Sequence, residues 1–292
     1  MKLILSRKGF DSSAGGVPSP ILPDGALCSL PIPERAPLPT PRRYDQIRLG
    51  HDSLGPLVAD LTRGRIGSDS AAHLDPDLRA DAAPRPPGWR PVFGQSHAAE
   101  RHLQNLGVGP GDLFLFYGWF RAVEQAAGRW RYVTGAPDLH VIFGWLQVDR
   151  RVPAAGWPEY APWAAGHPHC DRPGPRARDS LYLARAELRL PGHAARLAGA
   201  GVFPRYVQAL RLTAPGARRS LWRLPLWFHP SAGAPGLSYH TGPARWQAAA
   251  DHALLQTVGR GQEFVLDCDG YPAAIPWAAA LIRAHGMGAG RA

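Results

Sequence analysis

Residues 108–120 read Val-Gly-Pro-Gly-Asp-Leu-Phe-Leu-Phe-Tyr-Gly-Trp-Phe, a Gly-Asp turn followed by a continuous apolar run. A run of this kind, bounded by a turn, predicts a strand that is buried on both faces. Two further strand-like runs, 130–133 and 139–148, follow after short connections. Short connections favour antiparallel pairing, because a parallel pair needs a long crossover. We therefore expect a mainly antiparallel sheet in the middle of the chain.

The rest of the sequence predicts further strands and a few helices around this centre. The predicted strands are 3–5, 181–190, 206–212, 221–228 and 263–267, and the predicted helices are 54–61, 95–106, 245–257 and 275–283. Strands and helices do not alternate regularly, which argues against a doubly wound parallel sheet. The sequence thus predicts an α+β fold, with a mainly antiparallel curved sheet or barrel and helices packed outside. We expect one domain over residues 1–292, with a β-rich core around 108–270.

Composition narrows the class of protein. At 292 residues and 45% hydrophobic, the chain can bury a sizeable core. No apolar run approaches the eighteen or so residues of a membrane span, and the charged residues after Leu5 do not suit a signal peptide. The three cysteines, Cys28, Cys170 and Cys268, are scattered and odd in number. We expect them to be reduced, and we expect a cytoplasmic protein with no membrane partner.

The charge of the chain suggests its partner. The formal net charge is +10, and Lys2 and Lys8 are the only lysines among 33 basic residues. A basic surface attracts polyanions through counterion release, so we expect a nucleic acid or a nucleotide as the partner. The arginines are spread along the chain and form no block, so charge alone does not identify the ligand. The oligomeric state is left open.

The loop after the first predicted strand carries Lys8, Asp11, Ser12 and Ser13. A polar loop that follows a strand presents side chains to a ligand from a rigid support. A lysine retained in an arginine-rich chain supplies a compact ammonium group with an adjustable pKa, which arginine cannot supply. We interpret Lys8 and Asp11 as a catalytic pair and the two serines as ligand-binding residues. The alternative is a plain Gly/Ser turn.

Histidine and aspartate recur at a spacing that suits metal binding. His73 and Asp75 are two residues apart, and so are His169 and Asp171. In an extended segment this spacing places both side chains on one face, and two ligands of a facial iron triad have it. We expect a divalent metal, with iron as the candidate, at His169, Asp171 and His240, with His73 and Asp75 as the alternative pair. His73 is also a catalytic candidate, and the competing interpretation is an Asp-Pro turn with a capping aspartate.

The middle of the chain resembles PUA-like domains of the EVE and YTH kind. The likeness rests on the Gly-Asp turn before a strand with Phe-Tyr at 116–117 and on Ile-Phe-Gly-Trp-Leu-Gln-Val at 142–148. It implies a small β-barrel whose mouth takes up a nucleobase, with Trp119 and Trp145 available for stacking. Arg245 could bind a carboxylate or phosphate bidentately. Taken singly, the aromatic residues fit equally well as core residues of a sheet.

Stretches along nearly the whole chain are similar to the third of the nucleotide-modification-associated domain families. They are Leu-Ser-Arg-Lys-Gly-Phe-Asp-Ser-Ser at 5–13, His-Leu-Asp-Pro-Asp-Leu at 73–78, residues 111–121, residues 140–145, His-Pro-His at 167–169 and Gly-Gln-Glu-Phe-Val-Leu-Asp at 261–267. The resemblance implies a role in systems that alter bases in nucleic acid, DNA included. It does not fix a reaction or assign catalytic residues.

Three functions therefore stay open from the sequence. The first is an enzyme that acts on a nucleotide or base in a polar pocket containing Lys8 and Asp11, and this is the interpretation we favour. The second is an iron-dependent oxygenase with a His-x-Asp pair and a distal histidine. The third is a non-catalytic PUA-like reader of modified bases. We expect Lys8 and Asp11 to lie in the same concave pocket as at least two of four residues, namely His73, Asp75, His169 and His240.

Overall fold

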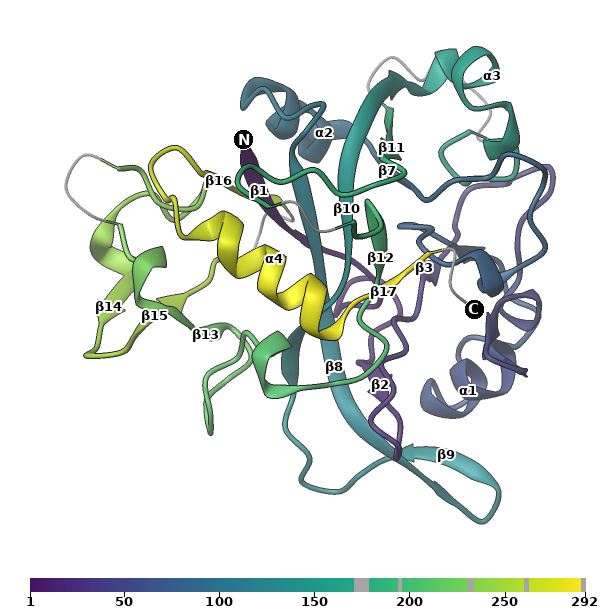
Figure 1. The fold of residues 1–292 in the computed structure, drawn as a ribbon. Coiled ribbons are helices and arrows are strands. Elements are labelled where there is room, and N and C mark those ends of the chain that lie inside the picture. Colours follow the sequence, from purple (N-terminus) through teal and green to yellow (C-terminus); the bar gives the residue numbers. More distant parts are fainter. Residues whose placement is uncertain (171–178, 194–195, 231–233, 260–262, 290–292) are drawn as a thin grey trace.

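The first strand of the chain lies inside the largest sheet. The computed structural model describes residues 1–170, 179–193, 196–230, 234–259 and 263–289. In it, β1 (Lys2–Arg7) pairs in parallel with β8 (Leu113–Ala126) and antiparallel with β16 (Glu263–Asp267). The apolar N-terminal run is buried between these two neighbours, which brings the start, the middle and the end of the chain together (Figure 1).

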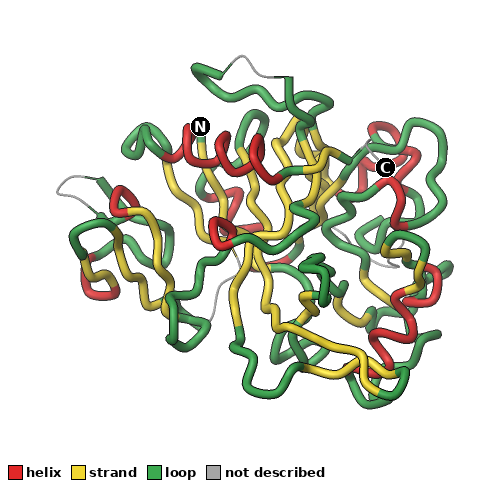
Figure 2. The backbone as a smooth tube through the Cα atoms, turned by 60° about the horizontal axis from the view of Figure 1, so that its bottom comes forward, coloured by secondary structure: helices red, strands yellow, loops and turns green. Residues whose placement is uncertain are grey.

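Most other pairs in this sheet are antiparallel. From β8 the sheet continues through β10 (Leu139–Pro153) and β11 (Ser180–Ala184) to β7 (Val92–Gln95). Among the described residues the sheet has ten strands, and the other four are β2 (Ser19–Ile21), β9 (Arg129–Tyr132), β12 (Ala200–Val202) and β17 (Met287–Gly288). Figure 2 shows these strands as a twisted, open layer.

Helices and small sheets surround this layer. The α-helices are α1 (Leu54–Leu61), α2 (His97–Asn105), α3 (Trp157–Tyr160) and α4 (Ala274–His285). The small sheets consist of β13 (Leu221–Pro225), β15 (His252–Gln256) and β14 (Trp246–Ala248); of β3 (Ile32–Pro33) and β6 (Ala72–His73); and of β4 (Arg48–Leu49) and β5 (Asp52–Ser53). No helix in the described part of the chain has the length and apolar character needed to cross a membrane.

The prediction of an α+β fold with a mainly antiparallel sheet is confirmed. The pairing of β8 with β9 and β10 is antiparallel, as the short connections indicate. The sheet does not close into a barrel in the described residues, because β16 and β7 lie at opposite ends of the strand order. The helix expected over 245–257 is wrong. Trp246 and Leu255 face each other across a strand pair and are both buried, so packing overrides the helix propensity of the alanines between them.

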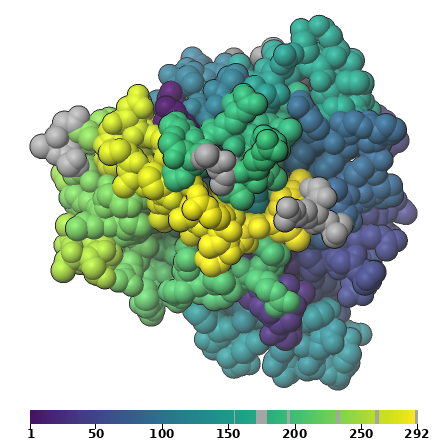
Figure 3. All heavy atoms as spheres, in the orientation of Figure 1, coloured from purple at the N-terminus to yellow at the C-terminus, as the bar shows by residue number. Residues whose placement is uncertain are grey.

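The main core forms along β8, whose first six residues are all buried. α4 contributes Ala278, Ala279 and Ile282 to the same core, and Figure 1 shows this helix crossing the sheet. In the space-filling view the C-terminal segment runs across this face, and only small parts of the N-terminal segment are visible (Figure 3). A second core cluster joins α1 to the N-terminal loops. The loops around the end of β1 are therefore held from both sides.

Candidate functional site

Two histidines and an aspartate meet in the interior near the end of β1. One ligand atom of each of His73, Asp75 and His169 lies within 4.8 Å of the others, and all three residues are buried. Nε2 of His73 lies 3.3 Å from Nε2 of His169, and Oδ2 of Asp75 lies 3.9 Å from the latter atom. Two imidazole nitrogens and one carboxylate that converge on one point make a donor set for a divalent cation.

A carboxylate outside this set lies within hydrogen-bond distance of one imidazole ring, and a second carboxylate lies near the other. Oε2 of Glu34 lies 2.6 Å from Nδ1 of His73, and Oδ2 of Asp179 lies 3.9 Å from Nδ1 of His169. A carboxylate at Nδ1 favours the tautomer with its proton on that atom, an arrangement that recurs behind metal-binding histidines. With both protons on Nδ1, the two Nε2 lone pairs face each other. A cation between them would turn that repulsion into binding.

Asp75 is held in place through its other oxygen. Oδ1 accepts a hydrogen bond of 2.7 Å from the backbone N–H of Gly94 and lies 3.3 Å from Nε2 of His167. Burial alone would raise the pKa of Asp75, but hydrogen bonding to His167 and the charges of the nearby histidines lower it to about 2. Burial lowers the pKa of His169 to about 4. At neutral pH the site therefore offers an ionised carboxylate and a neutral imidazole, the forms that bind a metal.

Gly94 in β7 makes room for the ring of His169. A Cβ atom at position 94 would lie 2.3 Å from Cδ2 and 2.5 Å from Cγ of that ring. Only a residue without a side chain lets the imidazole lie directly against the strand. Gly94 thus serves the site twice, by making room for the ring of His169 and by donating a hydrogen bond to Asp75.

His73, Asp75 and His169 line one side of a cavity of about 390 Å³, which we call the polar pocket. Its walls include Lys8, Asp11 and Ser13 from the N-terminal loop together with His73, Asp75 and His169. β1 leads directly into the loop, and β3 pairs with β6 to bring His73 beside it. The structure therefore places the N-terminal candidates and one histidine of each His-x-Asp pair around the same cavity.

The side chain of Lys8 is more buried than its position in a loop suggests. Its side chain is only 9% exposed, and Nζ lies 2.8 Å from Oε1 of Glu263, which is 1% exposed. Gln95 donates a second hydrogen bond to the same oxygen, and the Phe93 ring lies 4.6 Å from the ammonium group. Asp11 is not the partner of Lys8. Its Oδ1 accepts hydrogen bonds within its own loop, so the expected Lys8–Asp11 pair is replaced by Lys8–Glu263.

Unsatisfied polar atoms gather around the polar pocket. Among the described residues, five buried side-chain atoms lack a hydrogen bond of good geometry: Ser6 Oγ, Arg7 Nε, Glu263 Oε2, His167 Nε2 and His169 Nδ1. The two histidine atoms still lie near carboxylates, those of Asp75 and Asp179. Two of their residues line the pocket, and the other three are next to or in contact with residues that do. Native proteins leave few buried polar atoms unpaired, so their concentration at one place marks a site where a ligand is expected.

Comparison with known proteins identifies the family. A family model described as nucleotide modification associated domain 3 (Nmad3) matches residues 2–267. The chain belongs to this family. The match confirms the whole-chain resemblance seen in the sequence and includes every residue that lines the polar pocket of this Nmad3 protein. The name of the family indicates involvement in nucleotide modification. No curated protein and no solved structure matches the Nmad3 chain.

His240 of the Nmad3 chain is not part of the cluster. Its Nε2 accepts a hydrogen bond from the backbone N–H of Val258, and its Nδ1 lies 3.2 Å from the carbonyl oxygen of Ser238. Both ring nitrogens therefore have partners within the protein, and the structure brings His73 and Asp75, not His240, together with His169. Asp171, the other expected ligand, lies outside the described residues.

Most of the residues expected to bind a ligand do not line the polar pocket. Trp145 is buried in the core, and its Nε1 donates to the Ala198 carbonyl, so its ring faces cannot stack on a base. Trp119 is half-buried beneath the Arg219 guanidinium, 4.0 Å from the ring centroid. Arg245 is exposed on the surface, and Ser12 is exposed in the N-terminal loop. Of the expected ligand-binding set, Ser13 alone lines the pocket.

Several residues of the Nmad3 site have no signal in the sequence. Glu263 lies 255 positions from Lys8, and only the pairing of β1 with β16 brings them together. Glu34 sits in a proline-rich arm and reaches His73 through the pairing of β3 with β6. Gly94 and Gln95 belong to an edge strand with no pattern of its own. The His-Pro-His motif at 167–169 is the exception, since its density of ligands points to the site directly.

Proposed function

We propose that this Nmad3 protein is a metal-dependent enzyme that modifies a nucleotide or a base in nucleic acid, and that His73, Asp75 and His169 hold the metal. The observation that carries the proposal is the approach of the two Nε2 atoms to 3.3 Å, while carboxylates face both Nδ1 atoms. A metal bound there would supply Lewis acidity, an activated water or redox chemistry, depending on the ion. The family's link to nucleotide modification supplies the substrate class.

Iron(II) is our first candidate for the metal. Two histidines and one carboxylate leave several coordination positions open, and this set is typical of non-haem iron(II) oxygenases. The same set also suits catalytic zinc. An oxygenase consumes dioxygen and a two-electron reductant, whereas a zinc hydrolase requires only water. Dependence of turnover on oxygen therefore separates the two reactions.

The chain's own cations support an anionic substrate. Lys8, Arg7 and Arg35 all line the polar pocket. Neither arginine forms a carboxylate ion pair among the described residues, and Arg7 keeps a buried Nε without a partner. Lys8, fixed by Glu263 beside the histidines, would present a positive charge to a phosphate or to a developing negative charge. The aspartate and serines of the N-terminal loop would shape the rim.

The alternative of a base reader that does not catalyse a reaction has less support. It depends on aromatic rings exposed for stacking, and the burial of Trp145 removes one of the two that the sequence suggested. It also leaves the convergence of His73, Asp75 and His169 without a role. A reader would bind oligonucleotides in a salt-sensitive manner and leave them chemically unchanged.

Metal analysis and turnover test the proposal together. Protein purified without oxygen or chelator is analysed for iron and zinc, then incubated with nucleotides and oligonucleotides whose masses are followed. We expect bound metal in the wild type, and its loss in His73→Ala and His169→Ala. His51→Ala, at an exposed position outside the cluster, is the matched control. Full activity in metal-free protein, or equal metal content in all four proteins, would contradict the proposal.

A further inference from the structure

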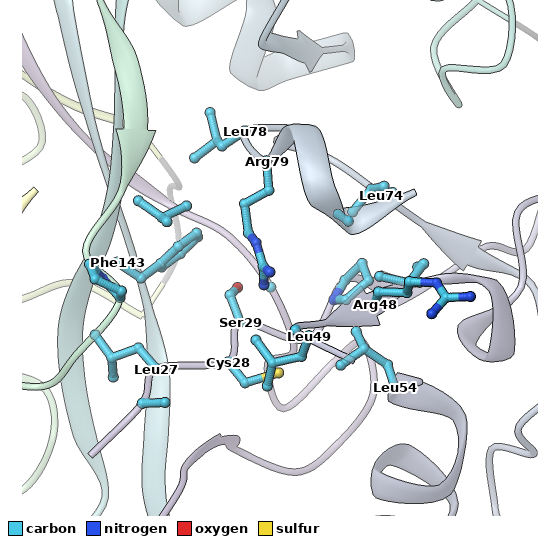
Figure 4. A pocket seen from close by; sticks show the side chains of 18 of the residues that line it. Leu27, Cys28, Ser29, Arg48, Leu49, Leu54, Leu74, Leu78, Arg79 and Phe143 are labelled. Atoms are coloured by element: carbon cyan, nitrogen blue, oxygen red, sulfur yellow. The ribbon is translucent and has the colours of Figure 1, made fainter. Parts of the chain in front are cut away.

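A second cavity adjoins the candidate metal centre. It has a volume of about 360 Å³ and is mainly apolar, and we call it the apolar cavity. Figure 4 shows Leu27, Leu49, Leu54, Leu78 and Phe143 around it. The cavity lies between the N-terminal loops, β4, the start of α1 and the segment 74–79. A volume of several hundred cubic ångströms is typical of a small-molecule site.

One short segment separates the apolar cavity from the polar pocket. His73 and Asp75 belong to the metal cluster, whereas Leu74 and Leu78 line the apolar cavity. Gly9 and Asp75 line both cavities. A molecule in the apolar cavity therefore lies next to a proposed metal ligand.

The polar groups in the apolar cavity select the kind of ligand. The Arg79 side chain extends into it, with its guanidinium toward Ser29 (Figure 4). Asp81 accepts hydrogen bonds from Nε and Nη2 of Arg79, so the charge is already paired and Nη1 is left as a donor. The Ser29 hydroxyl supplies a second donor. Burial raises the pKa of the neighbouring Cys28 thiol to about 12, so that residue contributes a neutral wall.

We propose that the apolar cavity binds the nucleobase of the substrate. A nucleobase is flat and uncharged, and its edge carries carbonyl and ring-nitrogen acceptors. The apolar walls suit its faces, and Arg79 and Ser29 supply donors for its edge. Asp81 already neutralises Arg79, and the rest of the lining carries four carboxylates against one further cation, so it disfavours a ligand with a carboxylate or phosphate; these residues are Asp24, Asp52, Asp75, Asp77 and Arg48. The inference rests on the proposed function, since the base so placed lies beside Asp75 of the metal cluster.

Nucleoside binding tests the inference without requiring turnover. The four deoxynucleosides are titrated by calorimetry into the wild type, Arg79→Met and Leu49→Trp, with deoxyribose 5-phosphate and benzoate as probes that lack a base. We expect at least one nucleoside to bind the wild type. Loss of the guanidinium donor should raise its Kd at least about tenfold, and the indole at the half-buried position 49 should abolish binding. Arg101→Met and Leu106→Trp, at exposed positions on or beside α2, are the matched controls.

A third variant separates this inference from the proposed function. His73→Ala should lose the metal and still bind the nucleoside, since His73 does not line the apolar cavity. Nucleoside binding that persists unchanged in both Arg79→Met and Leu49→Trp would overturn the inference, even if the metal is found. Binding of benzoate or deoxyribose 5-phosphate with no binding of any nucleoside would overturn it as well.

Discussion

Gly94→Ala tests the geometry of the candidate metal centre with a single added methyl group. The new Cβ would lie 2.3 Å from Cδ2 of His169, whereas ordinary van der Waals contact begins at 3.4 Å. The ring or the strand must therefore move by about 1.1 Å, the difference between the two distances. The backbone N–H that donates to Asp75 is kept, so the perturbation falls mainly on His169.

A displacement of this size exceeds what a metal site tolerates, since ligands must be held within about 0.5 Å of their productive positions. We expect the Kd for the metal to rise by about 10- to 100-fold, which corresponds to about 1.4 to 2.8 kcal/mol of binding free energy. Crowding of a packed interior should also lower the free energy of unfolding by about 1 to 3 kcal/mol.

Titration of the metal-free protein with iron(II) under nitrogen, or with cobalt(II), gives the affinity. The matched control is Gly166→Ala, because position 166 adjoins the same His-Pro-His motif and a Cβ there meets nothing within 4 Å. The control should bind metal as the wild type does. Wild-type affinity in Gly94→Ala would show that His169 is not a ligand in the observed position.

Three further predictions follow from buried charges. Lys8→Met should lower the free energy of unfolding by about 3 kcal/mol in chemical denaturation, because it leaves Glu263 buried and unpaired, and adding Glu263→Gln should restore most of the loss. If Glu263→Gln does not restore stability to Lys8→Met, the loss does not come from an unpaired Glu263 carboxylate. Glu34→Gln should raise the metal Kd about tenfold or more in the same titration, since it weakens the hold on Nδ1 of His73; an unchanged Kd would show that Glu34 does not support the site. Burial lowers the pKa of His140 to about 3, whereas in the unfolded chain this histidine is protonated below its ordinary pKa of about 6.5. The unfolded state therefore binds one more proton than the folded state between these values, and the free energy of unfolding falls as the pH drops from about 6.5 toward 3. In denaturation curves between pH 6.5 and 4.5, the free energy of unfolding of His140→Gln should fall by up to about 2.5 kcal/mol less than that of the wild type. Equal losses in the two proteins would show that His140 is not the source of this pH dependence.

Local patterns in the sequence were sufficient for the centre of the main sheet. The Gly-Asp turn and the apolar run after it specify β8, and short connections specify the antiparallel pairing with β9 and β10. Patterns failed where packing decides between two conformations. The alanine-rich stretch 246–256 has helix propensity, and its conformation is set by the burial of its ends in a strand pair. The pair is a local hairpin, but the core that buries Trp246 and Leu255 also contains residues far away in the sequence, such as Tyr117 and Leu266.

For the candidate site, too, the sequence reveals some of the residues and not others. Chemistry-bearing residues in dense motifs could be found, as Lys8, His73, Asp75 and His169 show. Which of these residues lie together depends on the pairing of strands that are far apart in the sequence. The sequence pattern therefore also suggests His240 as a ligand, although its ring nitrogens contact the backbone of Ser238 and Val258. The supporting residues Glu34, Gly94 and Glu263 act through position alone, and no single sequence reveals position.

X-ray absorption at the metal edge tests directly whether His73, Asp75 and His169 hold a metal ion. The protein is purified without chelator, loaded with iron(II) under nitrogen and measured beside His73→Ala. We expect one metal per chain, with two imidazole nitrogens and a carboxylate oxygen at about 2.0 to 2.2 Å, and loss of imidazole scattering in the variant. Failure of the wild type to retain any divalent metal, or an identical spectrum in His73→Ala, would contradict this expectation.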